Sequence, residues 1–471
     1  MTIMNDKTRE FVAMHRDEDV CELALKAKRV EGLDLSLALD QIAGWQIASK
    51  KLPQWASCEG IIYPPHISME QCSSQFTAQY KSEIAQTLLA SAATVRVRVS
   101  DSPESDTLVA KRAMVDLTGG FGVDFSYLAR GFSQATYVER QRHLCDLAEH
   151  NMAALGLDQA RIVCDDGVEY LDNMDPVDLI YIDPARRDEH GARTYAIEDC
   201  TPNVLELRDL LLAKSQCTLV KLSPMLDWRK AVADFDGAVR EVHIVATGNE
   251  CKELLLVLGR PAQADARDGV DGAGSHRRPA AHAHMGQMDI RARQTSNDKT
   301  PLARTRVEQM NGGMALADTV GSFDGESKAE RTVAASHDGR YAAPHVFCVN
   351  DDQRIDYDSA AYTQGLRIGG KPLPEAKNYL YEPNASIMKA GCFDLVEERF
   401  GVTQIGPSSH LFVSEQQIAD FPGRGFAIEA VGSMNKKGVC KISGWKLVNS
   451  WLGNYGNAHR IPTTNLTNSI C

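Results

Sequence analysis

The feature that most constrains the fold is a glycine-rich turn directly after a short apolar strand. Residues 115–124 read Val-Asp-Leu-Thr-Gly-Gly-Phe-Gly-Val-Asp. Glycine allows backbone dihedrals that side chains exclude, and it lets a ligand approach the backbone closely. A strand, a glycine turn and a helix in this order are typical of a parallel sheet with helices on both faces. The alternative interpretation is an ordinary glycine turn that binds nothing.

Strands and helices alternate after this turn. The expected strands are 114–117, 135–139, 161–163, 177–183 and 217–222, the expected helices are 125–130 and 144–155, and the pair 239–246 and 254–258 is expected to close the sheet in antiparallel fashion. This alternation predicts an α/β protein with a Rossmann-like sheet at its centre.

The chain of 471 residues is longer than one ordinary domain. Helical spacing of apolar residues runs to about residue 90, and periodicity is lost after residue 260. The predicted parts are a helical region at 1–92, the Rossmann-like domain at 93–260, a disordered insertion at 261–342, and two smaller α+β modules at 343–386 and 387–471.

Composition narrows the class of protein. Hydrophobic residues make up 43% of the chain and charged residues 24%, as in globular proteins. The 12 cysteines form no Cys-x-x-Cys pair or zinc-spaced cluster, so we expect reduced thiols, a cytoplasmic location and no metal. The sequence has no apolar run long enough for a membrane span. A net charge of −12 disfavours an unstructured basic nucleic-acid binder but permits a local basic groove.

A carboxylate follows the glycine turn at the end of the next expected strand. Glu139 lies 23 residues after Asp116, where an acid can accept hydrogen bonds from both ribose hydroxyls of a nucleoside. The spacing Asp-x-x-Gly-Gly-x-Gly differs from the Gly-x-Gly-x-x-Gly of nicotinamide enzymes. Asp116 would repel a pyrophosphate but suits a cationic sulfonium. This arrangement resembles motif I of class I methyltransferases. The resemblance implies S-adenosylmethionine as the cofactor, bound by Asp116, Thr118, Gly119, Gly120, Phe121, Gly122, Glu139, Asp165 and Asp166, the last two near the adenine amino group.

Candidate catalytic residues follow the fourth expected strand. Asp183 and Pro184 resemble the Asp/Asn-Pro-Pro motif of base methyltransferases, with Ala185 in place of the second proline. A cap at the end of the strand is the alternative role for Asp183. Arg186 and Arg187 either bind a substrate phosphate or form surface ion pairs.

The fifth expected strand ends in Lys221. No cysteine follows it, so covalent C5 methylation of a pyrimidine is not expected. Lys81, Asp183, Lys221 and Glu253 together resemble the Lys-Asp-Lys-Glu tetrad of ribose 2′-O-methyltransferases, in which burial would lower the pKa of a lysine that serves as base. In the competing interpretation Asp183 and Pro184 grip an exocyclic amino group, and Glu250 competes with Glu253 for its role.

Four segments together extend the resemblance to most of the chain. Residues 64–74, 116–124, 183–187 and 379–387 look like the bacterial THUMP-like-domain family of class I S-adenosylmethionine-dependent methyltransferases. That resemblance implies a helical N-terminal part, a Rossmann-like methyltransferase, and ferredoxin-like and THUMP-like C-terminal modules. It also implies methyl transfer to RNA, because THUMP modules bind RNA. Beyond Lys437 the sequence departs from the family.

A basic and aromatic surface for RNA is one further hypothesis for the C-terminal part, from Lys389, Arg424, Lys436, Lys437, Tyr381 and Phe412. Surface lysines and buried aromatics would give the same pattern. The alternatives to RNA methylation are methylation of a protein or small molecule, and a non-catalytic RNA-binding protein that keeps the fold.

Overall fold

The computed structural model describes residues 4–26, 31–64, 66–99, 112–186, 196–259, 343–361, 378–406 and 409–428. The predicted insertion at 261–342 and residues 429–471 of the predicted last module lie outside these ranges.

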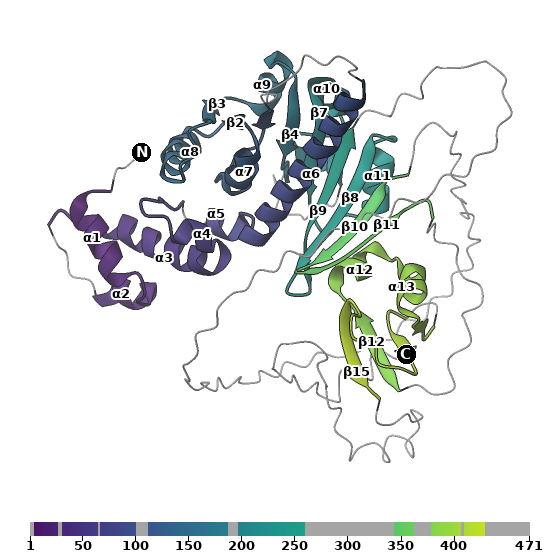
Figure 1. Cartoon of the computed structure of the whole chain (residues 1–471). Coiled ribbons are helices and arrows are strands. Elements are labelled where there is room, and N and C mark those ends of the chain that lie inside the picture. The colour runs from purple at the N-terminus through teal and green to yellow at the C-terminus, as the bar shows by residue number, and fades with distance from the viewer. Residues whose placement is uncertain are drawn as a thin grey trace, which may run out of the picture. The chain divides into compact units, whose positions relative to one another are not determined.

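The N-terminal part is helical, as predicted (Figure 1). Its helices are α1 (Asp6–His15), α2 (Val20–Lys26), α3 (Leu35–Lys51), α4 (Pro53–Ala56), α5 (His66–Gln71) and α6 (Gln75–Val99). Asn5 and Asp34 cap α1 and α3, because their side chains accept hydrogen bonds from backbone N–H groups of the first turn. Helix α6 continues past the predicted boundary at residue 92.

A nine-stranded sheet follows (Figure 1), in the order β11-β10-β8-β9-β7-β4-β1-β2-β3. Its strands are β1 (Ala113–Asp116), β2 (Gln134–Glu139), β3 (Ala160–Cys164), β4 (Val177–Ile182), β7 (Ser215–Leu222), β8 (Val239–Thr247), β9 (Glu250–Gly259), β10 (His345–Asn350) and β11 (Gln353–Asp358). Strand β1 pairs in parallel with both β2 and β4. Strand β9 runs antiparallel to β7 and β8, so the predicted closing pair is confirmed.

The two faces of the sheet pack into different cores, because successive side chains of a strand point to opposite faces. On β4, Leu179 and Tyr181 pack with the N-terminal helices, α7 (Val123–Leu128) and α8 (Arg142–Ala154). Ile180 and Ile182 pack on the other face, with residues of α10 (Arg208–Lys214), α11 (Trp228–Asp234) and the C-terminal part. Strand β4, which ends at the site, is therefore buried on both sides.

The C-terminal part forms a separate four-stranded sheet in the order β13-β14-β12-β15. Its elements are β12 (Tyr379–Pro383), α12 (Ala385–Ala390), α13 (Phe393–Phe400), β13 (Thr403–Gln404), β14 (Phe412–Ser414) and β15 (Gly423–Ala427). The predicted boundaries differ from this arrangement. Strands β10 and β11 belong to the large sheet, and the predicted boundary at 386/387 falls inside one small α+β unit, because sequence periodicity does not reveal which sheet a strand joins.

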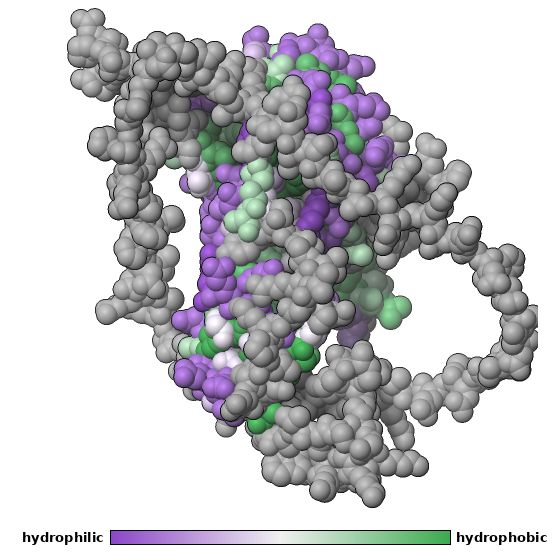
Figure 2. Space-filling model, turned by 90° about the vertical axis from the view of Figure 1, so that its right-hand side faces the viewer, coloured by the Kyte–Doolittle hydropathy of each residue, from purple (hydrophilic) through white to green (hydrophobic). Residues whose placement is uncertain are grey.

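Hydrophilic and hydrophobic residues are interspersed on the described part of one face (Figure 2). Among the residues that the structure describes, four large hydrophobic side chains are exposed, namely Met14, Leu25, Met225 and Ile405. Within the described ranges, no helix combines the length and the apolar character that a membrane span requires.

Candidate active site

A pocket of about 640 Å³ opens where the strand order reverses. Strands β2 and β3 lie on one side of β1, and β4 and β7 lie on the other. In open α/β sheets, ligands bind at such a reversal, beyond the carboxyl ends of the strands. The pocket is lined there by the glycine turn, Glu139, Asp183 and Lys221.

The glycine turn, residues 118–122, is required by packing as well as by the pocket. A Cβ on Gly119 would lie 2.2 Å from the Tyr137 ring, and the Tyr137 hydroxyl donates to the Gly120 carbonyl. Gly120 and Gly122 have φ of +55° and +85°, a region that favours glycine. A Cβ on Gly120 would come no nearer than 3.7 Å to the Thr118 carbonyl oxygen, so this position is open toward a ligand.

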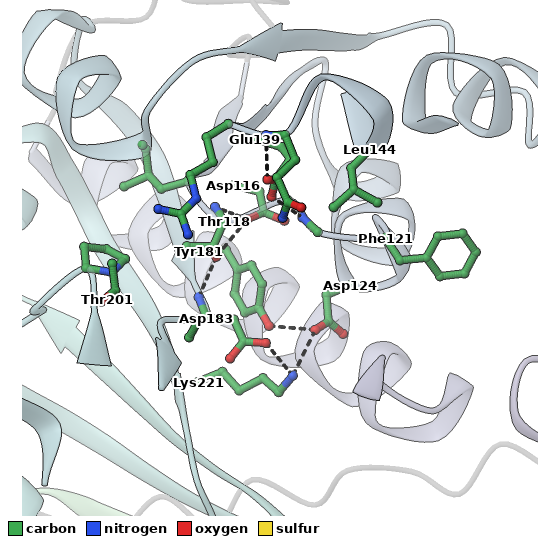
Figure 3. Close-up of a pocket in the computed structure, with 18 of the residues that line it drawn as sticks. Asp116, Thr118, Phe121, Asp124, Glu139, Leu144, Tyr181, Asp183, Thr201 and Lys221 are labelled. Carbon is green, nitrogen blue, oxygen red and sulfur yellow. Dashed lines mark hydrogen bonds and ion pairs between the residues drawn. The ribbon is translucent and has the colours of Figure 1, made fainter. Parts of the chain in front are cut away.

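Two carboxylates hold the turn through backbone N–H groups (Figure 3). Asp116 Oδ1 accepts from the Thr118 amide at 2.9 Å. Glu139 accepts from the Gly120 amide at 3.0 Å through Oε2 and from the Gln141 amide at 2.9 Å through Oε1. Each oxygen of Glu139 keeps a lone pair for a further donor. Burial raises the pKa of Asp116 well above its ordinary value.

Lys221 and Asp183 form an ion pair at the far side of the pocket (Figure 3). Lys221 Nζ lies 2.6 Å from Asp183 Oδ2. The Asp183 amide donates to the Thr118 hydroxyl at 2.7 Å, which joins the end of β4 to the glycine turn. Pro184 is buried behind this contact.

The structure brings all four residues of the predicted tetrad together, around a fifth charged residue. Lys81 is fully buried, bonds Glu253, and lies 3.2 Å from Asp124 Oδ1. Lys221 Nζ lies 3.8 Å from Asp124 Oδ2. We call Lys81, Asp124, Asp183, Lys221 and Glu253 the charge cluster.

The register of the sheet explains this convergence. Tyr181 and Leu219 are paired, as are Lys221 and Leu255, and side chains two residues apart share a face. Lys221 and Glu253 therefore point to the face that α6 and α7 cover, where Lys81 and Asp124 lie. Lys81 and Glu253 do not line the pocket; they lie beneath Asp124.

Three members of this site were missed by the sequence interpretation: Ser73, Asp124 and Tyr181. The hydroxyls of Ser73 and Tyr181 each donate to Asp124 Oδ2 at 2.7 Å. Asp124 closes the glycine motif, and Ser73 lies in the segment 64–74 that carries the family resemblance. Both were therefore visible in the motifs, but nothing local indicated that their side chains meet.

The expectation that burial lowers the pKa of Lys221 is wrong. Burial alone would lower it, but the carboxylates of Asp183, Asp124 and Glu253 outweigh burial and raise the pKa above its ordinary value. Burial likewise would raise the pKa of Asp124, yet the two lysines lower it. Asp183 has a raised pKa because burial outweighs the ammonium of Lys221.

The remaining candidates are placed as follows. Phe121 and Asp166 line the pocket, and Asp166 also caps α9 (Gly167–Asn173) by accepting from the Val168 amide. Asp165 does not line it; its Oδ1 accepts from the Asp166 amide. Glu250 pairs with Lys252 away from the cluster and does not replace Glu253. The side chain of Arg186, and Arg187 as a whole, lie outside the described residues.

The thiol of Cys72 also lines the pocket. Burial raises its pKa, so it is protonated at neutral pH and is a poor nucleophile.

The aromatic residues of the hypothetical C-terminal RNA surface are not available for stacking. Tyr381 and Phe412 are buried in the core, with Phe421 packed against both. Arg424 is paired with Glu382. Lys436 and Lys437 lie outside the described residues.

The fold and the pocket define a Rossmann-like α/β protein with a ligand site at the carboxyl ends of its central strands. A family model described as a ferredoxin-like domain matches residues 379–422. The small C-terminal α+β unit is thus ferredoxin-like, and it includes residues that the sequence interpretation gave to the THUMP-like module.

Among solved structures, the chain is similar to a proposed methyltransferase from Porphyromonas gingivalis W83. The two are 23% identical with a TM-score of 0.62, over 93% of this chain and 85% of the other, which shows a common fold. An O-methyltransferase from Bacillus cereus, solved with S-adenosylhomocysteine, is 9% identical with a TM-score of 0.31 over 48% of this chain and 100% of its own. An rRNA methylase from Streptococcus thermophilus is 17% identical with a TM-score of 0.24 over 32% of this chain and 87% of its own. Scores this low do not establish a shared fold. No curated protein matches the chain.

Proposed function

We propose that this protein is an S-adenosylmethionine-dependent methyltransferase that acts on RNA. The observation that carries the proposal is the pocket itself, in which a glycine turn and Glu139 lie at one side and the Asp183–Lys221 pair at the other. A nucleoside and a reacting group can be held there at the same time.

The residues present fit this cofactor. A pocket of about 640 Å³ is within the usual range for small-molecule sites. Glu139 retains one acceptor position on each oxygen, which suits two ribose hydroxyls. When ionised, the charge cluster has three carboxylates and two ammonium groups, so one negative charge remains to attract a sulfonium. The cofactor would supply an already activated methyl group, and the residues of this chain would align the acceptor.

We assign the alignment of the methyl acceptor to Asp183, Pro184 and Lys221. Lys81 and Glu253 act beneath them and fix Asp124. The assignments of Asp165, Asp166, Arg186 and Arg187 stay predictions, as does the expectation that no metal is needed. The acceptor is either a ribose hydroxyl or an exocyclic amino group.

RNA as the substrate is supported by the resemblance of the sequence to a family whose C-terminal modules bind RNA. A ferredoxin-like domain lies in the C-terminal part, as that resemblance implies. That the C-terminal part also contains a THUMP-like module is part of this proposal.

Calorimetric titration of S-adenosylmethionine tests the cofactor site, in the wild type, Gly120→Arg and Glu139→Ala. Arginine at the open Gly120 position should fill the pocket. Loss of two hydrogen bonds to the Glu139 carboxylate should weaken binding at least about 100-fold, since such bonds contribute roughly 1.5–3 kcal/mol each. Glu149→Ala, an exposed change on α8, is the control. A folded wild type that does not bind S-adenosylmethionine would refute the proposal.

Transfer of a tritiated methyl group then tests the substrate. Total RNA should accept label, and a protein extract and small metabolites should not. Asp183→Asn should lose label transfer while it keeps RNA binding. Label on protein instead of RNA would favour the protein-methylating alternative, and RNA binding without transfer by the wild type would favour a non-catalytic RNA-binding protein.

A further inference from the structure

We propose that Asp124 keeps Lys221 permanently protonated and in place, so that Asp183, and not Lys221, receives the proton that the methyl acceptor loses. This inference rests on the proposed methyltransferase function and assigns the proton path within its site. Asp124 is then a positioning residue, and Asp183 is a catalytic one.

The contacts of Lys221 Nζ are the first argument. Nζ faces Asp183 Oδ2 at 2.6 Å, the Ser73 hydroxyl oxygen at 3.3 Å and Asp124 Oδ2 at 3.8 Å. Nζ thus donates hydrogen bonds to Asp183 and Ser73, and it lies at ion-pair distance from the carboxylate of Asp124, a set of three oxygens that suits an ammonium. A neutral amine would direct its lone pair at one of them, which is repulsive.

The Ser73 hydroxyl fixes the direction of these bonds. It accepts from Lys81 at 3.3 Å and from Lys221 at 3.3 Å, which uses both of its lone pairs. Its single hydrogen faces two carboxylate oxygens, Asp124 Oδ2 at 2.7 Å and Glu253 Oε1 at 3.2 Å, of which Asp124 Oδ2 is the nearer. Ser73 thus accepts from Lys221 and has no hydrogen left to donate to it.

Asp124 is held as an anion from four directions. Tyr181 and Ser73 donate to Oδ2, Lys81 lies 3.2 Å from Oδ1, and Lys221 lies on the pocket side (Figure 3). Only 10% of its side chain is exposed, so its charge acts on Lys221 with little screening by water. Glu253 neutralises Lys81 from below.

Asp183 has the geometry of the proton acceptor. Lys221 occupies Oδ2, and among the described residues no donor reaches Oδ1. The side chain lines the pocket and is 37% exposed, whereas that of Lys221 is 15% exposed. Oδ1 is therefore the basic atom that an acceptor in the pocket can reach.

The step balances without another reagent. The acceptor atom uses its lone pair to bond the methyl carbon, the electron pair of the broken carbon–sulfur bond stays on sulfur, and the proton of the acceptor passes to Asp183. A carboxylate is a weak base that does not deprotonate a ribose hydroxyl in advance. An amino nitrogen can bond the methyl group first and release its proton afterwards. The proposal therefore favours an exocyclic amino group as the acceptor.

The titratable groups packed around Lys221 are Asp183 and Tyr181 of the β4 segment, Asp124 of α7, Glu253 of β9, Lys81 of α6, and Cys72 in the segment before α6. Of these, the carboxylates of Asp183, Asp124 and Glu253 raise the pKa of Lys221.

The test is the titration of Lys221 in the free protein, followed by the ¹³C shift of the labelled lysine Cε. The Lys221 signal is assigned by its absence in Lys221→Met. In the wild type we expect no deprotonation below about pH 10, near the ordinary lysine value. In Asp124→Asn the midpoint of the Lys221 titration should fall by roughly 1 pH unit or more, because one of the carboxylates that face Lys221 is lost. A wild-type midpoint between about pH 6 and 9 would overturn the proposal.

Tyr181→Phe is the matched control, since it removes a hydrogen bond to Asp124 and leaves every charge in place. Its midpoint should stay close to that of the wild type, and a fall equal to that of Asp124→Asn would also overturn the proposal. Asp124→Asn leaves Lys81 paired with Glu253 and Lys221 with Asp183, so no buried charge is unpaired. The wild-type titration remains decisive if the variant is unstable.

A pH–rate profile is the second readout. With Asp183 as the proton acceptor the rate falls only in acid, whereas with Lys221 as the base it rises through alkaline pH. Failure of the methyltransferase proposal appears separately, as absence of S-adenosylmethionine binding. Failure of this inference appears as normal binding with a Lys221 that titrates near neutral pH.

Discussion

The glycine turn and the charge cluster lie in one pocket but are built in different ways. The carboxylates at the glycine turn bond backbone N–H groups that are near in sequence, 2 residues away for Asp116 and 19 for Glu139. The charge cluster joins side chains that are far apart in sequence, 172 residues for Lys81 and Glu253 and 38 for Lys221 and Asp183. One part depends on local backbone conformation, and the other on the whole fold.

This difference sets how each part should fail. A backbone amide keeps its position when one side chain is changed, so the glycine turn should be sensitive mainly to steric change. Removing one partner of a buried ion pair leaves an uncompensated charge, so the cluster should be sensitive to any unbalanced substitution.

The largest effect is expected for Lys81→Met. Asp124 and Glu253 would then remain buried without their common cation, at a cost of roughly 3–5 kcal/mol in the free energy of unfolding. Urea denaturation measures this. Lys50→Met, on the exposed side of α3, is the control. The double variant Lys81→Met/Glu253→Gln should recover part of the loss, and no recovery would argue against charge imbalance as the cause.

Gly119→Ala should break the glycine turn sterically. Its Cβ would lie 2.2 Å from the Tyr137 ring, and such overpacking costs about 1–3 kcal/mol. Gly131→Ala is the matched control, because its Cβ would meet only Gln86 Cγ at 3.7 Å. If the two variants have equal unfolding midpoints, the glycine turn accommodates the added methyl group without a loss of stability.

The contrast between the two parts also explains which features of the fold and the site could be predicted from the sequence. Glu139 and the glycine turn were predictable because their spacing is a local pattern, and the strands were predictable from their apolar runs. Asp183 and Lys221 were singled out because they follow or end expected strands, whereas Lys81 and Glu253 were found only by likeness to a known tetrad. Asp124 was missed because its contacts to Lys81 and Lys221 depend on which face of the sheet α6 and α7 cover, which no periodicity records. The small C-terminal sheet was divided wrongly for the same reason, since strand pairing is not local.

Asp116 and Asp124 should respond oppositely to pH. Burial raises the pKa of Asp116, so its contribution to stability is present below about pH 4 and is lost as pH rises through the folded-state pKa. The pKa of Asp124 is lowered, so its contribution is present above about pH 4 and is lost in acid. The free energy of unfolding of Asp116→Asn should therefore rise relative to that of the wild type as the pH increases from about 4 to 7.

The measurement is the difference in unfolding free energy between Asp116→Asn and the wild type at several pH values. Asp172→Asn, an exposed change on α9, is the control. A difference that does not vary with pH would mean that Asp116 is no more protonated in the folded than in the unfolded protein.

The smallest effect is expected where the two parts touch. The Thr118 hydroxyl accepts from the Asp183 amide at 2.7 Å and lies 3.4 Å from Asp116 Oδ1. Thr118→Val removes this acceptor and should cost about 1 kcal/mol, the usual net value of a hydrogen bond. Thr118→Ser keeps the hydroxyl and should cost less, because the loss of a methyl group leaves the bond intact. If the Thr118→Val and Thr118→Ser variants are equally stable in urea, the sheet holds the glycine turn and the charge cluster independently of each other. If only valine is destabilised, Thr118 transmits the position of the turn to Asp183, and S-adenosylmethionine binding should then alter the titration of that carboxyl.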